Sequence, residues 1–300
     1  MTPAPIALFV YNRPVHTRKT IEALQKNRLS DSSELFVFSD APKTAEAERG
    51  VRQVRDYLHS IDGFRKVTLV EQLENRGLAR SIIAGVTRLV EEFGQVIVLE
   101  DDLVTTPHFL DFMNAGLERY GADDRVMQIA GYMFPVSLPP AYDALFLSFI
   151  SSWGWATWAR AWRHFDPLAR GYAALRADPI MQRKFDLDGH YRYSRMLQAQ
   201  QQGKAESWAI RWYLSVFMRQ GLALYPRKSL VRNIGFDGSG VNCNVSKFAQ
   251  DELDTTFRAK VFPDTIEVSP ESATVVRGIP RPTPSLASIG NKIRGLLARR

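Results

Sequence analysis

The sequence predicts an α/β protein built around a mostly parallel sheet that is covered by helices. Over the first 120 residues, strand-like and helix-like segments alternate, the strand-like segments are short apolar runs, and polar residues stand where each run ends. Apolar runs without alternation suit strands that are buried on both faces, and the βαβ order favours parallel pairing. We therefore expect a Rossmann-like sheet with ligands beyond the carboxyl ends of its strands.

Each expected element has a sequence signal of its own. The strands, rich in aliphatic, β-branched and aromatic residues, are expected at 6–12, 34–41, 66–72 and 95–102. Apolar residues recur at three- and four-residue steps in 78–93 and form one stripe, which predicts an amphipathic helix there. The other helices are expected at 16–27, 47–61 and 107–120.

Three consecutive acids, Glu100, Asp101 and Asp102, stand at the end of the fourth apolar run. They repel one another and each would be costly to bury unpaired, so a positive group is expected beside them. Carboxylate oxygens suit Mg²⁺ or Mn²⁺, particularly when the phosphates of a substrate complete the octahedron. The alternative is that the acids cap the helix expected at 107–120, whose N-terminal dipole favours negative charge. The triplet alone leaves both interpretations open.

Several function classes lose support from what the sequence lacks. It contains no GxxxxGKS/T loop, no GxGxxG after the first strand, no HExxH and no GxSxG, which argues against P-loop kinases and dinucleotide dehydrogenases in particular. The single cysteine, Cys243, excludes an intrachain disulfide and a thiolate zinc cage. The five histidines show no HxH or HxxxH pairing, so surface or packing roles are expected for them.

The net charge of +7 is concentrated at the end of the chain. Six basic residues and no acids lie in 272–300, so the remainder carries a net charge of about +1. Nucleic acid is therefore not an expected partner. No apolar run approaches the ~20 residues needed to cross a bilayer, and we expect a cytoplasmic protein.

All six tryptophans lie between residues 153 and 212. Trp158 and Trp162 are four residues apart, and this spacing favours a buried helix face. Gly154 stands between two indoles, where glycine allows a turn or the close approach of a ligand. The flanking rings then suggest a platform for a sugar or a base.

Four stretches together resemble a known family. They are VLEDDL after an apolar strand, the GW-rich segment, SWAIRWYLSVFMRQGLALYP and NIGFDGSGVN. As a set they are similar to type A (GT-A) glycosyltransferases that use nucleotide sugars, in particular the N-acetylglucosaminyltransferase I-like group and bacterial polysaccharide sugar transferases. The resemblance spans roughly residues 5–245. We expect a donor half at 5–120, an acceptor-side half at 121–271 packed on the same unit, and a Pro-rich linker with a basic tail at 272–300.

The resemblance implies a role for individual residues. Asp102 is the implied ligand of Mn²⁺ or Mg²⁺ with the donor diphosphate, and Glu100 and Asp101 lie along the ribose and the transferred sugar. Arg13 in YNRP matches a contact to the donor nucleotide, and Asp40 matches a carboxylate that reads the base. The donor is expected to be a UDP-sugar. The remaining expected donor-binding residues are Asn75, Arg80, Trp155 and Trp208.

The catalytic base is where the sequence departs from the family. Relatives place Asp after the tryptophan of this motif, but here Trp208 is followed by Ala209, which takes no proton. Glu206 is the first substitute and Asp237 the second. The alternatives are that Glu206 is a solvated helix-start acid and that Asp237 organises a Gly-rich turn. A single base acting in a single displacement predicts inversion at the anomeric carbon.

Three functions remain open at this point. The first is a metal-dependent glycosyltransferase that builds a bacterial surface polysaccharide on a glycan or lipid-linked acceptor. The second is a non-catalytic module that binds a nucleotide sugar or a glycan, which Ala209 favours. The third is a sugar nucleotidyltransferase, for which no Gly-rich, Arg-containing loop follows the first strand.

The tail at 285–300 is basic and amphipathic, and it suggests peripheral contact with an anionic membrane. A disordered, solvated end is the alternative, because Gly290 and Gly295 each weaken a helix by roughly 1 kcal/mol.

Overall fold

A computed structural model describes residues 2–139, 142–237 and 252–279 of the chain. The strands are β1 (Ile6–Val10), β2 (Glu34–Ser39), β3 (Lys66–Glu71), β4 (Gln95–Glu100), β5 (Leu103–Thr105), β6 (Val126–Ala130), β7 (Ala144–Leu147), β8 (Trp155–Trp158), β9 (Leu222–Pro226) and β10 (Val231–Asn233). The helices are α1 (Pro14–Gln25), α2 (Ala45–Leu58), α3 (Leu78–Phe93), α4 (Phe109–Arg119), α5 (Ala159–Trp162), α6 (Tyr172–Ala177), α7 (Pro179–Phe185), α8 (Tyr193–Gln201), α9 (Trp208–Met218) and α10 (Ser272–Gly278).

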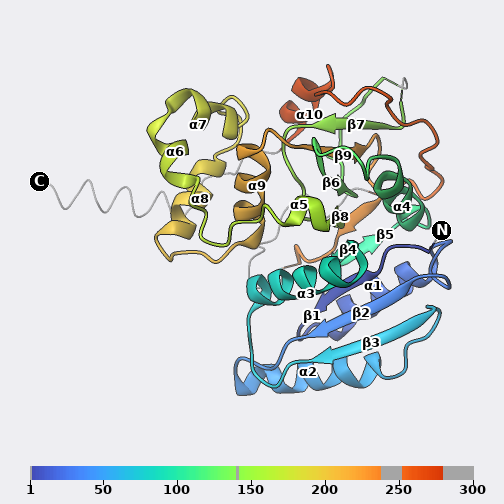
Figure 1. Cartoon of the computed structure of the whole chain (residues 1–300). Coiled ribbons are helices and arrows are strands. Elements are labelled where there is room, and N and C mark those ends of the chain that lie inside the picture. Colours follow the sequence, from blue (N-terminus) through green and yellow to red (C-terminus); the bar gives the residue numbers. More distant parts are fainter. Residues whose placement is uncertain (1, 140–141, 238–251, 280–300) are drawn as a thin grey trace, which may run out of the picture.

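Ten described strands form two sheets. The large sheet has eight strands in the order β3-β2-β1-β4-β8-β6-β9-β7, and β10 pairs with β5 in a small antiparallel ribbon. Figure 1 shows β1 to β3 with α2 at one end of the molecule and α6 to α8 grouped to one side of the other end. The fold class predicted from the sequence is confirmed, because a mostly parallel first half is flanked by helices.

The first four strands and three helices follow the sequence signals closely. The apolar stripe of α3 is buried against the sheet through Ile82, Val86 and Leu89. Gly94 ends the helix with a φ of 78°, in the left-handed region, which glycine adopts readily because it has no Cβ. Helix α1 begins at Pro14, where the fixed φ suits the first helical turn and the missing N–H costs nothing.

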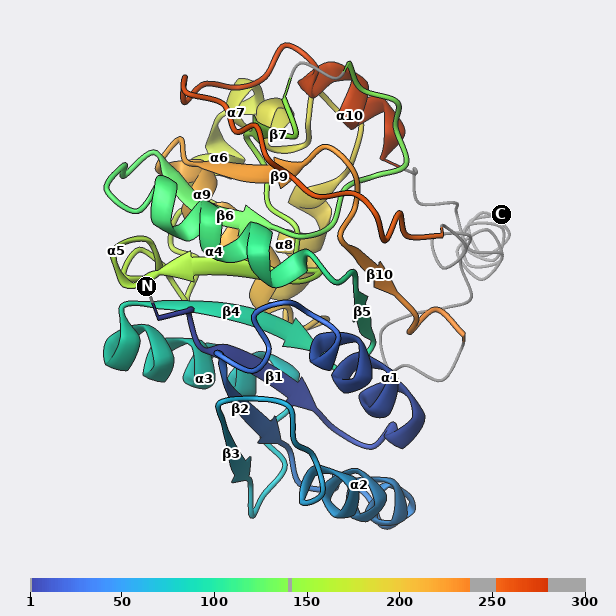
Figure 2. The ribbon, with the colours of Figure 1, turned by 90° about the vertical axis from the view of Figure 1, so that its right-hand side faces the viewer.

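Helices cover both faces of the large sheet. The chain runs from β1 through β2 to β3 and then returns to β4 beside β1, so α3 lies on the face opposite to α1 and α2. On the α3 face, the Nε1 of Trp162 in α5 donates to the Oγ1 of Thr87 at 2.9 Å. On the other face, Asn27 after α1 accepts from the backbone N of Leu110 in α4 at 2.9 Å. Figure 2 shows α3 and α1 separated by the strands.

Strand β8 joins the two halves of the chain. It runs antiparallel between β4 and β6, with Trp155 opposite both Val98 and Ala130. The segment of Trp155 to Trp158 is thus a strand. The helix face expected from the spacing of Trp158 and Trp162 is limited to the single turn of α5, which begins after Trp158 and ends at Trp162, and both indoles are buried. One sheet therefore continues across the boundary expected at residue 120.

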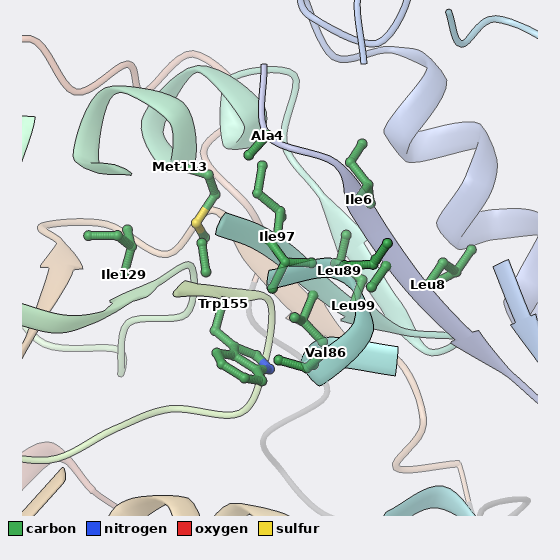
Figure 3. Close-up of a cluster of buried hydrophobic side chains, with 14 of the residues drawn as sticks. Ala4, Ile6, Leu8, Val86, Leu89, Ile97, Leu99, Met113, Ile129 and Trp155 are labelled. Atoms are coloured by element: carbon green, nitrogen blue, oxygen red, sulfur yellow. The ribbon is translucent and has the colours of Figure 1, made fainter. Parts of the chain in front are cut away.

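The core lies on both faces of the central strands. Figure 3 shows side chains from β1, β4, β8, α3 and α4 meeting in one cluster. The C-terminal segment differs from the prediction at its start: α10 packs on the fold, with Val275 fully buried, instead of forming a linker. The predicted tail at 285–300 lies outside the described residues. Within the described part of the chain, no helix combines the length and the apolarity that a bilayer crossing requires.

Candidate functional site

A cavity of about 340 Å³ lies at the carboxyl ends of β1, β2 and β4 and at the start of α3. We call it the charged cavity, because seven of the residues that line it carry a charged group. They are Arg13, Asp40, Lys43, Glu100, Asp101, Asp102 and Glu206. This is the edge of the sheet where the sequence predicts a ligand site. Six of these seven charged residues, all except Lys43, belong to the eleven site residues that the sequence predicts.

Arg13 is the positive group beside the acid triplet. Its Nη2 lies 2.6 Å from Oδ1 of Asp101 and 2.7 Å from Oδ2 of Asp102. The backbone N of Tyr11 donates to the other oxygen of Asp101 at 3.3 Å. These contacts contradict the helix-cap alternative, because α4 begins only at Phe109 and its first turn is capped by the side chain of Asn27 instead of by the acids. The loops after β1 and β4 are instead tied to each other through their side chains.

The charged cavity is lined by more carboxylates than positively charged side chains. Burial, together with the neighbouring charges of Asp102 and Asp101, raises the pKa of Glu100 to about 8 against the influence of Arg13. Burial also raises the pKa of Asp101, although Arg13 opposes this shift. One guanidinium therefore does not balance three carboxylates, and a further cation in the cavity would favour their ionised forms.

The loop that follows β10 covers Asp102. The backbone N of Ile234 donates to the carbonyl of Asp102 at 2.8 Å, and a Cβ at Gly235 would collide with the carboxylate of Asp102. The Nη1 of Arg13 also lies near Gly235 and is buried without a hydrogen-bond partner in the described part of the chain. A buried guanidinium N–H of this kind is a donor available to an anionic ligand.

Asp40 and Asn75 line the same cavity but already hold backbone groups. The carboxylate of Asp40 accepts from the backbone N of Arg76 at 2.9 Å and of Gly77 at 2.8 Å. The amide of Asn75 donates to the carbonyl of Ala41 at 2.6 Å. Both side chains therefore fix the loops after β2 and β3 together, in addition to facing the cavity.

The candidate bases lie in different places. Glu206, just before α9, lines the charged cavity at its rim, where its Oε1 is 3.9 Å from the Nε of Arg80. Both side chains are more than half exposed. Asp237 is not among the residues that line this cavity, and its Oδ2 is 3.1 Å from the Nε2 of His16.

The structure places Trp155 and Trp208 in the core. Trp155 is 1% exposed and Trp208 is 4% exposed, and their rings stack with centroids 5.0 Å apart. Neither lines the charged cavity, so their expected role as a donor platform is corrected to packing between α9 and the sheet. Gly154 has the expected positive φ of 62°, but its close neighbours are Val231 and Phe109, which are core side chains.

Sequence reasoning missed three residues that shape the site. Lys43 lines the cavity from the loop after β2, and its position at a strand end was the available signal. The hydroxyl of Tyr11 accepts from the backbone N of Lys43 at 2.9 Å and thereby joins two of the loops. Gly50 in α2 allows the helix to approach the loop of Arg13, because an added Cβ would lie 2.5 Å from the carbonyl of Asn12. No local pattern in the sequence reveals that contact.

The fit of the site to a divalent cation can be judged from its donors. Within the described ranges, no group of three or more His, Cys, Asp or Glu side chains could enclose a metal ion. Asp101 and Asp102 nevertheless present adjacent carboxylates, and their negative charges add to the effect of burial in raising the pKa of Glu100. Mg²⁺ in proteins is often held by one or two carboxylates together with substrate phosphates. The residues fit a cation of that kind.

Comparisons with known proteins give limited guidance. No family model matches the sequence, and no curated protein matches it. Three similar solved structures are a mannosyltransferase, PcManGT, from Pyrobaculum calidifontis in complex with GDP-Man and Mn²⁺, TarS from S. aureus, and mouse xyloside xylosyltransferase 1 in its apo form.

These likenesses are distant. The sequence identities are 17%, 12% and 12%, and the TM-scores are 0.34, 0.34 and 0.37. The matches cover 52%, 49% and 72% of this chain and 46%, 25% and 82% of the respective structures. The chain therefore spans less than half of the first two proteins.

Proposed function

We propose that the protein is a glycosyltransferase that takes a nucleotide-sugar donor in the charged cavity. The observation that carries this proposal is the set of three carboxylates around a guanidinium at the carboxyl ends of β1 and β4. In sheets of this kind, ligands bind outside those strand ends. A cavity that mixes fixed acids with Arg13 and Lys43 suits a ligand that carries both hydroxyl groups and phosphates.

The parts of the donor are assigned by the chemistry of the lining residues. The partnerless Nη1 of Arg13 and the amine of Lys43 would contact the diphosphate, because both are cations at one cavity. The carboxylates of Glu100 and Asp101 would accept hydrogen bonds from hydroxyl groups of the ribose or the transferred sugar. The nucleoside would lie toward the loops that Asp40 and Asn75 hold. We expect a UDP-sugar.

Asp102, with Asp101, would hold Mn²⁺ or Mg²⁺ together with the diphosphate. When bound, such a cation neutralises the negative charge that grows on the leaving diphosphate. The residues of the chain determine where the cation would bind. Arg13 fixes the two carboxylates, and the loop at Gly235 holds Asp102 against the cavity.

Transfer also needs a group that removes a proton from the acceptor. The acceptor oxygen would attack the anomeric carbon, the bond from that carbon to the diphosphate would break, and Glu206 would take the hydroxyl proton. Glu206 is preferred to Asp237 because it lines the charged cavity, whereas Asp237 is paired with His16. A single displacement inverts the anomeric centre and releases a nucleoside diphosphate.

The wider role follows from the resemblance alone. We propose an acceptor that is a glycan or a lipid-linked glycan, in the synthesis of a bacterial surface polysaccharide. Peripheral contact with the membrane would come from the tail at 285–300, and the site of action would be the cytoplasmic side.

The donor assignment is tested with Asp102→Asn. Titration calorimetry with a panel of nucleotide sugars and Mn²⁺ should show donor binding by the unmodified protein, and the variant should bind at least about tenfold more weakly, or about 1.4 kcal/mol. Asp111→Asn is the matched control, because Asp111 is also a partly buried carboxylate near cations but lies outside the charged cavity. Equal donor affinity in the Asp102 variant and the control would refute the assigned role of Asp102.

The catalytic assignment is tested with Glu206→Gln. Release of nucleoside diphosphate in the presence of acceptor extracts should fall about 100-fold or more, while donor affinity stays within about twofold. The other candidate functions give different products. A nucleotidyltransferase would release pyrophosphate from a nucleoside triphosphate and a sugar 1-phosphate, and a non-catalytic module, which Ala209 and the exposed position of Glu206 favour, would bind donor without turnover.

A further inference from the structure

A second cavity of about 340 Å³ lies on the other side of the start of α9. We call it the aromatic cavity. Seven of the residues that line it are aromatic, six carry a hydroxyl group, and Asp, Glu, Lys and Arg are absent from the lining among the described residues. We propose that the aromatic cavity binds an uncharged sugar ring of the acceptor. The assignment of this ring to an acceptor rests on the proposed function.

Two segments of the chain contribute to both cavities. At the start of α9, Glu206 lines the charged cavity, while Ala209, three residues later, lines the aromatic cavity. After β10, Gly235 contacts the carboxylate of Asp102, while the next residue, Phe236, lines the aromatic cavity. The two cavities are therefore neighbours, and an acceptor held in the second would present a hydroxyl group to Glu206 at the rim of the first.

The wall between the cavities is rigid. Trp208 lies between Glu206 and Ala209 in sequence and is buried in a stack with Trp155 of β8. Ser207 caps α9 by accepting from the backbone N of Ile210. A fixed wall holds two ligands at one relative orientation, and such positioning lowers the barrier of a reaction between them.

The lining favours a neutral sugar ring over other occupants. The face of an aromatic ring carries negative potential and attracts the weakly positive C–H groups of a pyranose. Hydroxyl groups from tyrosine and serine side chains are spread over the same wall, at Tyr191, Tyr193, Ser151 and Ser152 among others. A hydrocarbon chain would displace water from these hydroxyl groups without offering them a hydrogen bond, and a charged sugar would be desolvated without a counter-ion.

The size of the cavity agrees with this occupant. Its volume is at the lower end of the range found for ligand pockets, as expected for a single ring instead of a long chain. Another cavity, of about 1180 Å³ beside α7 and α10, is lined by charged and apolar residues together and shares no lining residue with the charged cavity.

Saturation-transfer NMR with a panel of methyl glycosides of neutral sugars tests the proposal on the full chain. Transfer to the ring protons of at least one glycoside is expected, with an affinity that falls about tenfold in Met196→Trp. Met196 lies in α8 at the edge of the aromatic cavity and is 43% exposed, so a larger ring there narrows the cavity without disturbing the core. Met218→Trp is the matched control, since Met218 is a helical methionine with 39% exposure outside that cavity.

Ala209→Leu provides a second variant, which fills the cavity from its wall. It should abolish the same transfer, and near-UV circular dichroism confirms that the core tryptophans keep their packing. Absence of transfer from every glycoside, equal affinity in Met196→Trp and Met218→Trp, or binding of a short prenyl alcohol in place of the glycosides would overturn the proposal.

Failure of the proposed function gives a different result. A protein that binds no nucleotide sugar but still binds a glycoside in the aromatic cavity has the sugar site without the transferase chemistry. Binding of nucleotide sugars without binding of any glycoside would refute the sugar site in the aromatic cavity and leave the donor assignment standing.

Discussion

The charged cavity and the aromatic cavity have the same volume and opposite chemistry. The first is built by loops that follow consecutive strands of a parallel sheet, so its side chains sit on short, rigid turns. The second is built by α8, α9 and segments that are distant from each other in the sequence. Charged groups are concentrated where the leaving group would need stabilisation, whereas a neutral wall suffices to orient an acceptor. Three changes to the chain sharpen this contrast, and the largest effect is expected in the charged cavity.

Arg13→Met should remove about 3 kcal/mol of folding stability, because Asp101 and Asp102 would remain buried without their cation. Urea unfolding measures the loss. The control is Arg119→Met, whose exposed pair with Asp264 should be worth less than about 1 kcal/mol. Mn²⁺ should restore more stability to Arg13→Met than to the unmodified protein. Equal losses in the two variants would show that the triplet does not depend on Arg13.

Trp155→Phe should cost about 1–2 kcal/mol of stability through lost packing with Trp208, and donor affinity should stay unchanged. Thermal unfolding and donor titration are measured on the same samples. A weaker donor affinity at unchanged stability would instead show that Trp155 contributes to donor binding as well as to the core.

Glu100→Gln should change how stability depends on pH. In the folded protein, burial raises the pKa of Glu100 to about 8 from an ordinary value of 4.5, so the folded state holds the proton more tightly than the unfolded chain does. Stability that depends on this proton is present below about pH 4.5 and is lost as the pH rises toward 8. With a chelator present, the Gln variant should therefore become progressively more stable relative to the unmodified protein as the pH rises from 5 to 8.

The result that would contradict this expectation is a stability difference between the two proteins that does not change with pH. It would mean that Glu100 is ionised in the folded state throughout, so that the cavity already holds enough positive charge.

Local signals in the sequence predicted the first half well. The expected strands at 6–12 and 95–102 contain β1 and β4, and α3 has the predicted bounds of Leu78 to Phe93, because burial of an amphipathic stripe and a C-terminal glycine act over a few residues. The acid triplet and Arg13 were predictable for the same reason: each follows a strand whose end faces a common edge.

The second half depends on contacts that local patterns do not encode. The apolar residues from Trp155 to Trp158 are compatible with either a helix or a strand. Only their pairing with β4 and β6 makes this segment a strand. The burial of Trp208 likewise depends on its stacking with Trp155, which lies more than fifty residues earlier in the sequence. The contact of Gly235 with Asp102 and the meeting of α8 with α9 are long-range packing events. Of the aromatic cavity, the sequence therefore indicated only the rings beside Gly154, of which Trp153 lines the cavity.

The antiparallel pairing of β8 with β4 has a consequence for how the chain can be divided. Removing everything after residue 120 would take β8 away from β4 and leave one edge of this strand, with its apolar centre from Val96 to Leu99, open to other molecules. Such a fragment would be prone to self-association. The loops that line the charged cavity therefore depend on the second half of the chain, and a change of ligand specificity would have to come from substitutions within an intact sheet instead of from an exchange of halves.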